Sequence, residues 1–185
     1  ILKEAVLELR TEELARDGKA VLADNEVSGI SQDDFVTDTA IDTDLELLLP
    51  SDYVPQESER INLYRELDAI ERDADIDAFA ERLRDRFGTT PHVTEELLKV
   101  PALRARARRL GIEKVVLKQG KMYLYFVSEE NRAYYQSPMF GRLLTYAQQN
   151  FRSVHIRQNS GKRSFLIDNV PTASAALKIL SDTLV

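Results

Sequence analysis

Residues 75–112 constrain the fold most, because apolar residues at helical spacing alternate there with residues that start and stop helices. One apolar stripe of five residues marks the first helix: Ile76, Phe79, Ala80, Leu83 and Phe87. Asp75 stands at an N-cap position, and Gly88 stands where a left-handed residue ends many helices.

Two more helices follow in the same run. Thr90 can cap the second helix, and Pro91 suits its first position, where an N–H would have no partner. Pro101 lacks an N–H donor and clashes with the preceding turn, so it breaks or kinks this helix. The third helix ends at Gly111. The run therefore predicts an all-helical block.

The rest of the chain adds strands to this block. Residues 56–72 predict a helix, with Ile61, Tyr64, Leu67 and Ile70 inward, that pairs with the next helix as an antiparallel hairpin. Residues 45–49 predict a short strand that ends at Pro50. After Gly111 the apolar period becomes strand-like, and the chain reads as hairpin, helix, hairpin, helix. Two such units predict an α+β fold, an antiparallel sheet with helices packed on one face.

The hairpins and helices of this second half have recognisable boundaries. Gln119-Gly120 and Asn159-Ser160-Gly161 predict the turns of the two hairpins. Ser137-Pro138 and Val170-Pro171 each precede an apolar helix.

The N-terminal part differs from the rest. Residues 1–16 predict an amphipathic helix, and residues 17–42 are acidic and aperiodic, so we expect a mobile connector that proteases cut first. We therefore divide the chain into residues 1–44, a helix and connector, and residues 45–185, an α+β domain. The chain begins without Met and already in helical rhythm, so we expect a fragment of a longer protein.

Composition excludes several classes of protein. The 185 residues include no Cys, so no disulfide or thiolate metal site is possible. No apolar run approaches the roughly 20 residues that span a bilayer, and no signal peptide is present. We expect a cytoplasmic protein without a membrane partner.

Charge is divided unevenly along the chain. Residues 1–98 hold 10 Lys+Arg and 26 Asp+Glu, a net charge of -16, whereas residues 99–185 hold 15 and 5, a net charge of +10. The two halves can pair within one domain, or one of them can face a charged partner.

No residue pattern predicts catalysis or a cofactor. Gly120-Lys121 and Gly161-Lys162 lack the Ser or Thr that follows Lys in a phosphate-binding loop. His92 and His155 lie on different predicted elements, and Asp38, Asp42 and Asp44 lack the Gly and Glu of a calcium loop. We expect neither a metal site nor an enzyme.

A basic helix is the one candidate for nucleic-acid binding. Arg104, Arg108 and Arg109 form a possible basic patch near its C-terminus. Cations there also favour the helix dipole, so pairing with the acidic half is the alternative. A nucleic-acid-binding module that uses the basic half remains open.

Two segments carry a family resemblance. The run DRFGTTPHVTEELLKVPALRARARRLGIEKV is similar to the C-terminal domain of bacterial transcription-repair coupling factor, and so is the upstream run LLLPSDYVPQESERINLYREL. The match covers roughly residues 45–127. Its upstream positions are Pro50, Asp52, Tyr53, Val54, Pro55, Arg60, Ile61 and Tyr64. Pro101 departs from the family, which usually keeps an unbroken helix there.

The resemblance implies a regulatory, non-catalytic domain of an ATP-driven DNA translocase that displaces stalled RNA polymerase and recruits excision repair. In that family, charged residues before the DRFG phenylalanine contact an N-terminal module that resembles UvrB, and this contact hides the surface that recruits UvrA. Asp85 and Arg86 match those positions, while Arg82 stands where the family often has an acid. The residues expected in the interdomain contact are therefore Arg82, Asp85 and Arg86.

Overall fold

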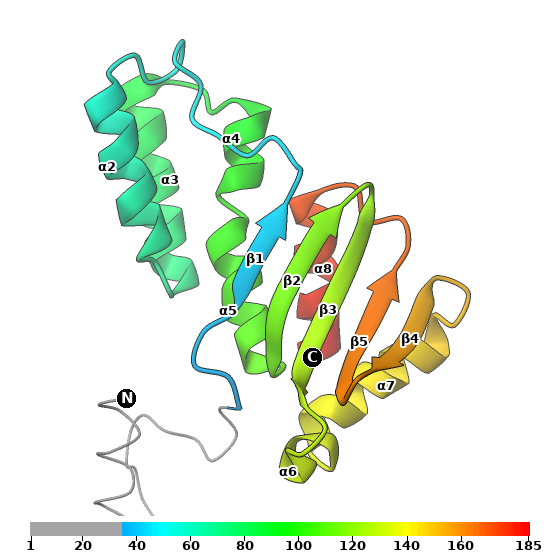
Figure 1. The fold of residues 1–185 in the computed structure, drawn as a ribbon. Coiled ribbons are helices and arrows are strands. Elements are labelled where there is room, and N and C mark those ends of the chain that lie inside the picture. Colours follow the sequence, from blue (N-terminus) through cyan, green and yellow to red (C-terminus); the bar gives the residue numbers. More distant parts are fainter. Residues whose placement is uncertain (1–34) are drawn as a thin grey trace, which may run out of the picture. The chain divides into compact units, whose positions relative to one another are not determined.

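Residues 35–185 are described by the computed structural model, and Figure 1 shows their elements in chain order. They belong to one unit, Asp33–Val185. The helix expected over residues 1–16 and most of the connector lie outside the described residues. The strands are β1 (Ala40–Thr43), β2 (Ile112–Lys118), β3 (Lys121–Ser128), β4 (Val154–Asn159) and β5 (Lys162–Ile167). The helices are α2 (Glu57–Asp68), α3 (Asp73–Phe87), α4 (His92–Leu97), α5 (Val100–Arg109), α6 (Arg132–Tyr135), α7 (Pro138–Gln149) and α8 (Ala173–Leu184).

The strands form one mixed sheet in the order β1-β2-β3-β5-β4. β2–β3 and β4–β5 are antiparallel hairpins joined by an antiparallel β3–β5 pair, which confirms the predicted α+β arrangement. β1 pairs with β2 in parallel. Parallel neighbours need a long crossover rather than a tight turn. Here that crossover contains α2, α3, α4 and α5, so the helical block is inserted between two neighbouring strands.

Both hairpins close through two-residue turns. Gln119 and Gly120 have φ values of 54° and 71°, and Ser160 and Gly161 have 50° and 77°. Positive φ at both positions is typical of a type I′ turn, whose twist matches that of the strands. The two Gly-Lys sequences are therefore the ends of hairpin turns.

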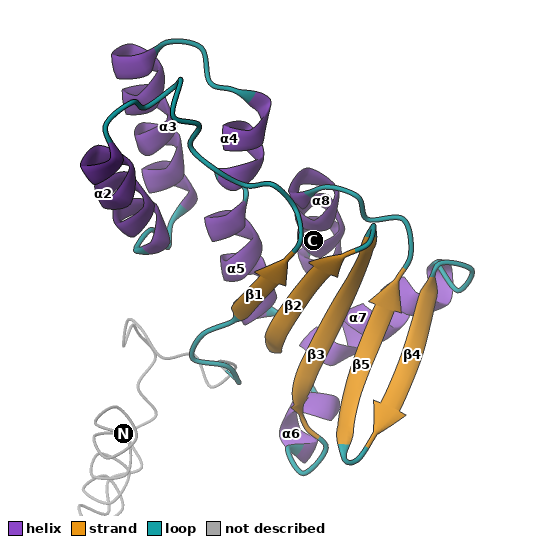
Figure 2. Ribbon diagram, turned by 45° about the horizontal axis from the view of Figure 1, so that its top comes forward, coloured by secondary structure: helices purple, strands orange, loops and turns teal. Residues whose placement is uncertain are grey.

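Helices α5, α7 and α8 cover one face of the sheet (Figures 1 and 2). Alternate strand residues and one stripe of each helix meet there in the sheet core, as strand and helix periodicity require. Phe126 lies at its centre, with its ring edge-on to Phe140 and Phe165. Other members of the sheet core are Leu103, Ala107, Val115, Leu117, Leu124, Leu143 and Leu180.

A second cluster, the helical core, lies between α2, α3 and α4. It contains Leu67, Phe79, Leu83 and Leu98, and Leu49, Tyr53 and Val54 come from the segment before α2. Leu83 is 1% exposed, which confirms the predicted stripe of α3. Ile61 was expected to face inward but is 44% exposed, because α2 turns Leu67 and Tyr64 toward α3 and leaves Ile61 outside.

Several predicted boundaries are wrong. The strand lies at Ala40–Thr43 rather than at residues 45–49, so residues expected in the connector belong to the sheet. Thr43 fixes β1, because its hydroxyl donates to the Leu117 carbonyl over 2.8 Å and its side-chain oxygen accepts from the Leu45 N–H. Helix α3 begins at Asp73 after Arg72, and Asp75 forms an ion pair with Arg72 instead of capping. Pro91 rather than Thr90 precedes α4.

Pro101 has the predicted effect. Helix α4 ends at Leu97, and Pro101 occupies the second position of α5, where a missing N–H costs no helical hydrogen bond.

Two polar contacts tie α4 to other parts of the fold. The Thr94 hydroxyl donates to the Leu48 carbonyl over 2.8 Å. Glu96 is 9% exposed, and its carboxylate accepts from both the backbone N–H and the hydroxyl of Ser174 at the start of α8. An acid at a helix N-terminus satisfies free N–H groups and favours the dipole. Glu96 therefore joins the helical block to the helix layer of the sheet. Among the described residues, no helix is long and apolar enough to cross a membrane.

Candidate docking site

The three residues expected in an interdomain contact lie together in a groove between α2 and α3. The groove has a volume of about 240 Å³. Its floor is apolar and consists of Leu63, Phe79, Leu83 and Phe87, and its rim carries Arg82, Asp85 and Arg86. We call this feature the α2–α3 groove.

The two rim arginines hold the hairpin together. Arg82 forms an ion pair with Glu66 and lies 5.4 Å from the centre of the Phe79 ring. Arg86 forms an ion pair with Glu59, whose side chain is 17% exposed, and lies 5.2 Å from the centre of the Phe87 ring. Both pairs join α3 to α2, so each arginine contributes to the domain's own structure.

Asp85 differs from its neighbours on the rim. It is exposed, and it forms no ion pair or hydrogen bond with any residue that the structure describes. A fixed charge beside an apolar floor, without a partner in the described part of the chain, is available to an external cation. Asp85 is the rim residue with the clearest capacity to bind another surface.

The segment before α2 supports the groove from below. The Tyr53 hydroxyl lies 3.2 Å from the carbonyl oxygens of Leu83 and Gly88, and its ring packs edge-on against Phe87. Arg60 donates to the Val54 carbonyl over 2.7 Å. The motif residues Tyr53, Val54 and Arg60 thus fix the end of α3, and hence the positions of Asp85 and Arg86. Spacing alone could not reveal this supporting role.

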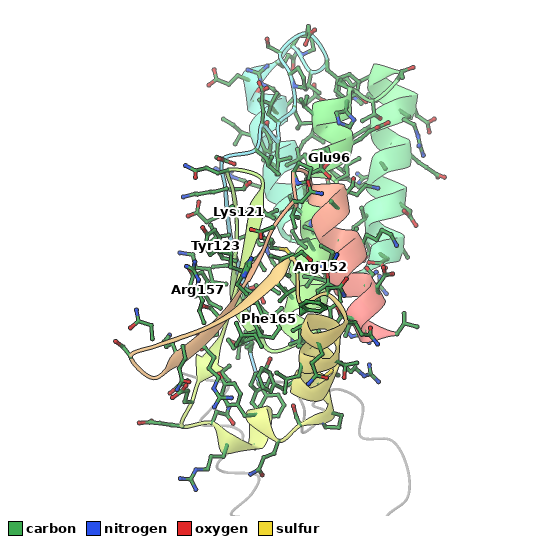
Figure 3. All side chains as sticks on the ribbon, turned by 90° about the vertical axis from the view of Figure 1, so that its right-hand side faces the viewer. Glu96, Lys121, Tyr123, Arg152, Arg157 and Phe165 are labelled. Atoms are coloured by element: carbon green, nitrogen blue, oxygen red, sulfur yellow. The ribbon has the colours of Figure 1, made fainter. Side chains whose placement is uncertain are left out.

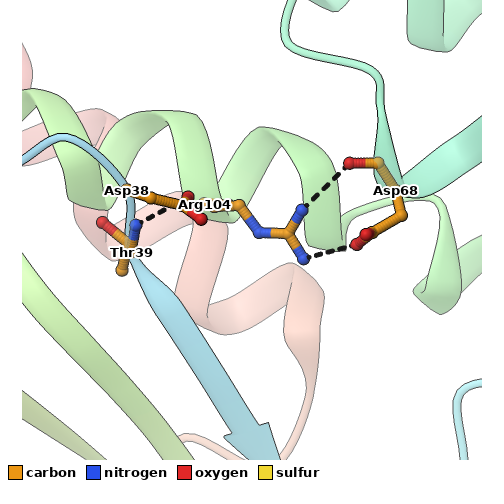
Figure 4. A network of polar contacts seen from close by, with 4 residues as sticks. All are labelled: Asp38, Thr39, Asp68 and Arg104. Carbon is orange, nitrogen blue, oxygen red and sulfur yellow. Dashed lines mark hydrogen bonds and ion pairs between the residues drawn. The ribbon is translucent and has the colours of Figure 1, made fainter. Parts of the chain in front are cut away.

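The possible basic patch on α5 faces acids of the helical block. Arg104 donates to the Asp68 carboxylate over 3.0 Å and to the Asp68 backbone carbonyl over 3.2 Å (Figure 4). Arg106 contacts the Asp73 carboxylate, with one N–O distance of 3.1 Å. The bond from Arg106 lowers the pKa of Asp73, although burial opposes that shift.

Arg108 and Arg109 lie beside Arg104 on a cavity of about 560 Å³ between α5 and the α2–α3 turn. The same cavity contains Asp38, whose carboxylate accepts from the Thr39 N–H (Figure 4). The basic helix and the acidic half therefore meet within one domain, as the intramolecular alternative predicts.

The acids expected in the connector also have structural partners. Asp42 forms an ion pair with Lys118 over 3.0 Å, and Asp44 accepts from the Gln119 N–H over 2.9 Å. Both contacts fix β1 to the first hairpin. His92 lies at the start of α4, and His155 on β4 contacts Asp168 over 2.7 Å. The described residues hold no cluster of three or more groups able to bind a metal ion.

Comparisons with known proteins match the part of the chain that contains the α2–α3 groove. The model of the TRCF domain matches residues 43–137, more than half of the chain. The transcription-repair-coupling factor of Escherichia coli K12 is 32% identical over 81 residues, which cover 42% of this chain and 7% of that protein. The corresponding protein of Mycobacterium tuberculosis is 31% identical over 103 residues, which cover 56% of this chain and 8% of that protein.

A solved structure shares the fold. The crystal structure of a C-terminal domain of transcription-repair coupling factor superposes with a TM-score of 0.62 at 16% identity, covering 80% of this chain and 95% of that one. The matched segments span between 6% and 10% of the length of the curated relatives. The family model covers the groove, its supporting segment and the first hairpin, and the chain belongs to the TRCF domain family.

Proposed function

We propose that this domain is the non-catalytic docking module of a transcription-repair coupling factor. It binds the UvrB-like N-terminal module of the same protein through the α2–α3 groove and masks the surface that recruits UvrA. The full-length protein acts as an ATP-driven DNA translocase that displaces stalled RNA polymerase and recruits excision repair. This function unites the family match with a groove that contains all three expected contact residues.

The composition of the groove supports docking to a protein. Specific interfaces combine an apolar centre with a polar rim, and arginines and aromatic rings are enriched in them. The α2–α3 groove has that arrangement, with Phe79 and Phe87 below Arg82 and Arg86. The observation that carries the proposal is that Asp85 has no partner among residues 35–185, because its charge is satisfied best when a cation of the partner reaches the groove.

Such a module represses its protein by adding contacts to the closed state alone. A ligand shifts a conformational equilibrium only by its difference in affinity for the two states. DNA or polymerase would therefore open the protein by binding the open state more tightly than the groove contacts hold the closed one. Masking of UvrA recruitment follows if both partners use one surface of the N-terminal module.

Calorimetric titration of the 185-residue chain with that module tests docking. Asp85→Lys reverses the unpaired charge, and we expect affinity to fall at least tenfold, because like charges then meet across the interface. The fold should be unaffected, since an exposed cation near the C-terminus of α3 favours the helix dipole. Arg86 is unsuitable for reversal, because a new acid there would face Glu59.

Asp77→Lys is the matched control. Asp77 is also exposed on α3 and lies four residues from Glu81, as Asp85 does, but it lines a different cavity. The two variants make the same change of net charge. An equal loss of affinity in both, or no loss in Asp85→Lys, would contradict docking through the α2–α3 groove.

A further inference from the structure

The sheet has a second face that no described helix covers. Helices α5, α7 and α8 lie on one side, and Lys121, Tyr123 and Arg157 lie on the other (Figure 3). Phe165 lies between the sheet and the helices, as its 1% exposure requires (Figure 3). We call the uncovered side the open face.

The strand register places the side chains of the open face in rows. One row crosses all five strands: Ala40, Lys114, Tyr125, Ser164 and Arg157. The next row contains Asp42, Val116, Tyr123, Leu166 and His155. Lys118 and Lys121 lie opposite each other beyond it. The first row therefore sets one tyrosine between two cations, with small residues beside them.

The cations on the open face differ in whether they have partners. Lys118 pairs with Asp42, and Lys121 lies 3.7 Å from Asp168. Lys114 and Arg157 form no ion pair or hydrogen bond with any described residue, although Lys114 helps to lower the pKa of Asp42. Hydrogen bonding to Lys118 is the main cause of that lowering. The row through Tyr125 thus holds two cations that form no ion pair or hydrogen bond within the part of the chain that the structure describes.

Tyr123 and Tyr125 lie next to each other in the middle of the face. Their rings are nearly parallel, at 10°, with centres 6.4 Å apart. Both side chains are half-buried, and neither hydroxyl bonds to a described residue. Aromatic rings between cations are the combination that binds single strands, since bases stack on the rings while phosphates meet the cations.

We propose that the open face binds single-stranded DNA, with bases stacked on Tyr123 and Tyr125 and phosphates held by Lys114 and Arg157. These cations are three strand spacings apart, about 14 Å for strands about 4.8 Å apart. The single-stranded DNA therefore crosses the sheet along the row of Lys114, Tyr125 and Arg157. The paired bases of a DNA duplex would not reach the tyrosine rings. Rings and cations do not distinguish the two sugars, so the choice of DNA over RNA rests on the proposed function.

Fluorescence anisotropy with a labelled thymidine 20-mer tests this site in the 185-residue chain. The double variant Lys114→Glu with Arg157→Glu should bind at least tenfold more weakly at low salt. The slope of log affinity against log salt should also fall by about 1.4, because each phosphate contact to a single strand contributes about 0.7. Tyr125→Leu keeps apolar area but loses the flat ring, so we expect at least fivefold weaker binding with an unchanged slope.

The control pair is Lys99→Glu with Arg152→Glu, which makes the same change of net charge. Both residues are exposed and lie off the open face, Lys99 before α5 and Arg152 on the helix side (Figure 3). This control pair and Asp85→Lys should each bind the 20-mer with an affinity within threefold of the parent. A failure of the DNA-binding proposal can therefore be told apart from a failure of docking through the α2–α3 groove.

Four results would overturn the proposal. The first two are that the parent chain does not bind the 20-mer at low salt, and that the control pair loses as much affinity as Lys114→Glu with Arg157→Glu. The other two are that the chain binds RNA of matched sequence at least tenfold more tightly than DNA, and that it binds a poly-glutamate peptide as tightly as the 20-mer.

Discussion

Gly111 shows how one residue sets the junction between the helical block and the sheet. It follows α5 with a φ of 73°, and a Cβ added there would lie 2.2 Å from Cε2 of Tyr134. The Tyr134 ring is fully buried, and its hydroxyl donates to the Leu110 carbonyl over 2.7 Å. Burial raises the pKa of Tyr134, so the phenol stays neutral and keeps this bond. The sequence predicts the helix stop, but not the tyrosine packed against it.

We expect Gly111→Ala to destabilise the domain by about 2–4 kcal/mol, through left-handed strain and overpacking together. Gly120→Ala is the control for strain alone, because Gly120 has a φ of 71° and open space around it. It should cost about 1 kcal/mol. Urea unfolding measures both, and equal costs would contradict the role given to Tyr134.

We expect Leu83→Ala to cost about 2–5 kcal/mol, because Leu83 is 1% exposed in the helical core. Ile61→Ala should stay within about 0.5 kcal/mol, since Ile61 is 44% exposed. Urea unfolding again separates the two. A loss at Leu83 no larger than that at Ile61 would show that the face of α3 is assigned wrongly.

At the scale of elements, the sequence predicts the types of helix and strand well where they have a strong apolar period. The α3 stripe, the two hairpins and α7 are clear, because periodicity records which face is buried. β1 is missed because AIDT has no alternation of its own, and its place depends on pairing with β2 far along the chain. Ion pairs between α2 and α3 are missed for the same reason, although the apolar stripe correctly places Asp85 and Arg86 on the helix that is α3.

The Asp73–Arg106 pair, which joins α3 to α5, should make stability depend on pH. Hydrogen bonding to Arg106 lowers the pKa of Asp73 below its ordinary value of 3.8. The carboxylate therefore adds stability above about pH 4, which is lost as pH falls through the lower folded value. Asp73→Asn should lower the melting temperature at pH 7. The loss in the free energy of unfolding should be at most about 1 kcal/mol, because the pair is largely exposed.

Thermal unfolding of parent and Asp73→Asn from pH 7 to pH 2 measures this effect. The two curves should converge below pH 4, whereas Asp77→Asn should follow the parent throughout, because Asp77 forms no ion pair with a described residue. A gap between parent and Asp73→Asn that persists at pH 2 would exclude protonation of Asp73 as its cause.

At the scale of the whole described unit, two cores share one chain. The sheet core holds the strands together with α5, α7 and α8, and the helical core holds α2, α3 and α4 of the crossover between β1 and β2. Glu96, Arg104 and Arg106 join them through polar contacts. The α2–α3 groove lies over the helical core, and the open face lies on the sheet. The two proposed sites therefore belong to different parts of the domain and can be altered separately.

Competition for the N-terminal module tests the central claim most directly. UvrA retained by the immobilised UvrB-like module is measured while the 185-residue chain is added. The parent chain and Asp77→Lys should displace UvrA at the concentrations at which they bind the module, and Asp85→Lys should need at least tenfold more. Retention of UvrA unchanged by saturating parent chain would contradict masking through the α2–α3 groove.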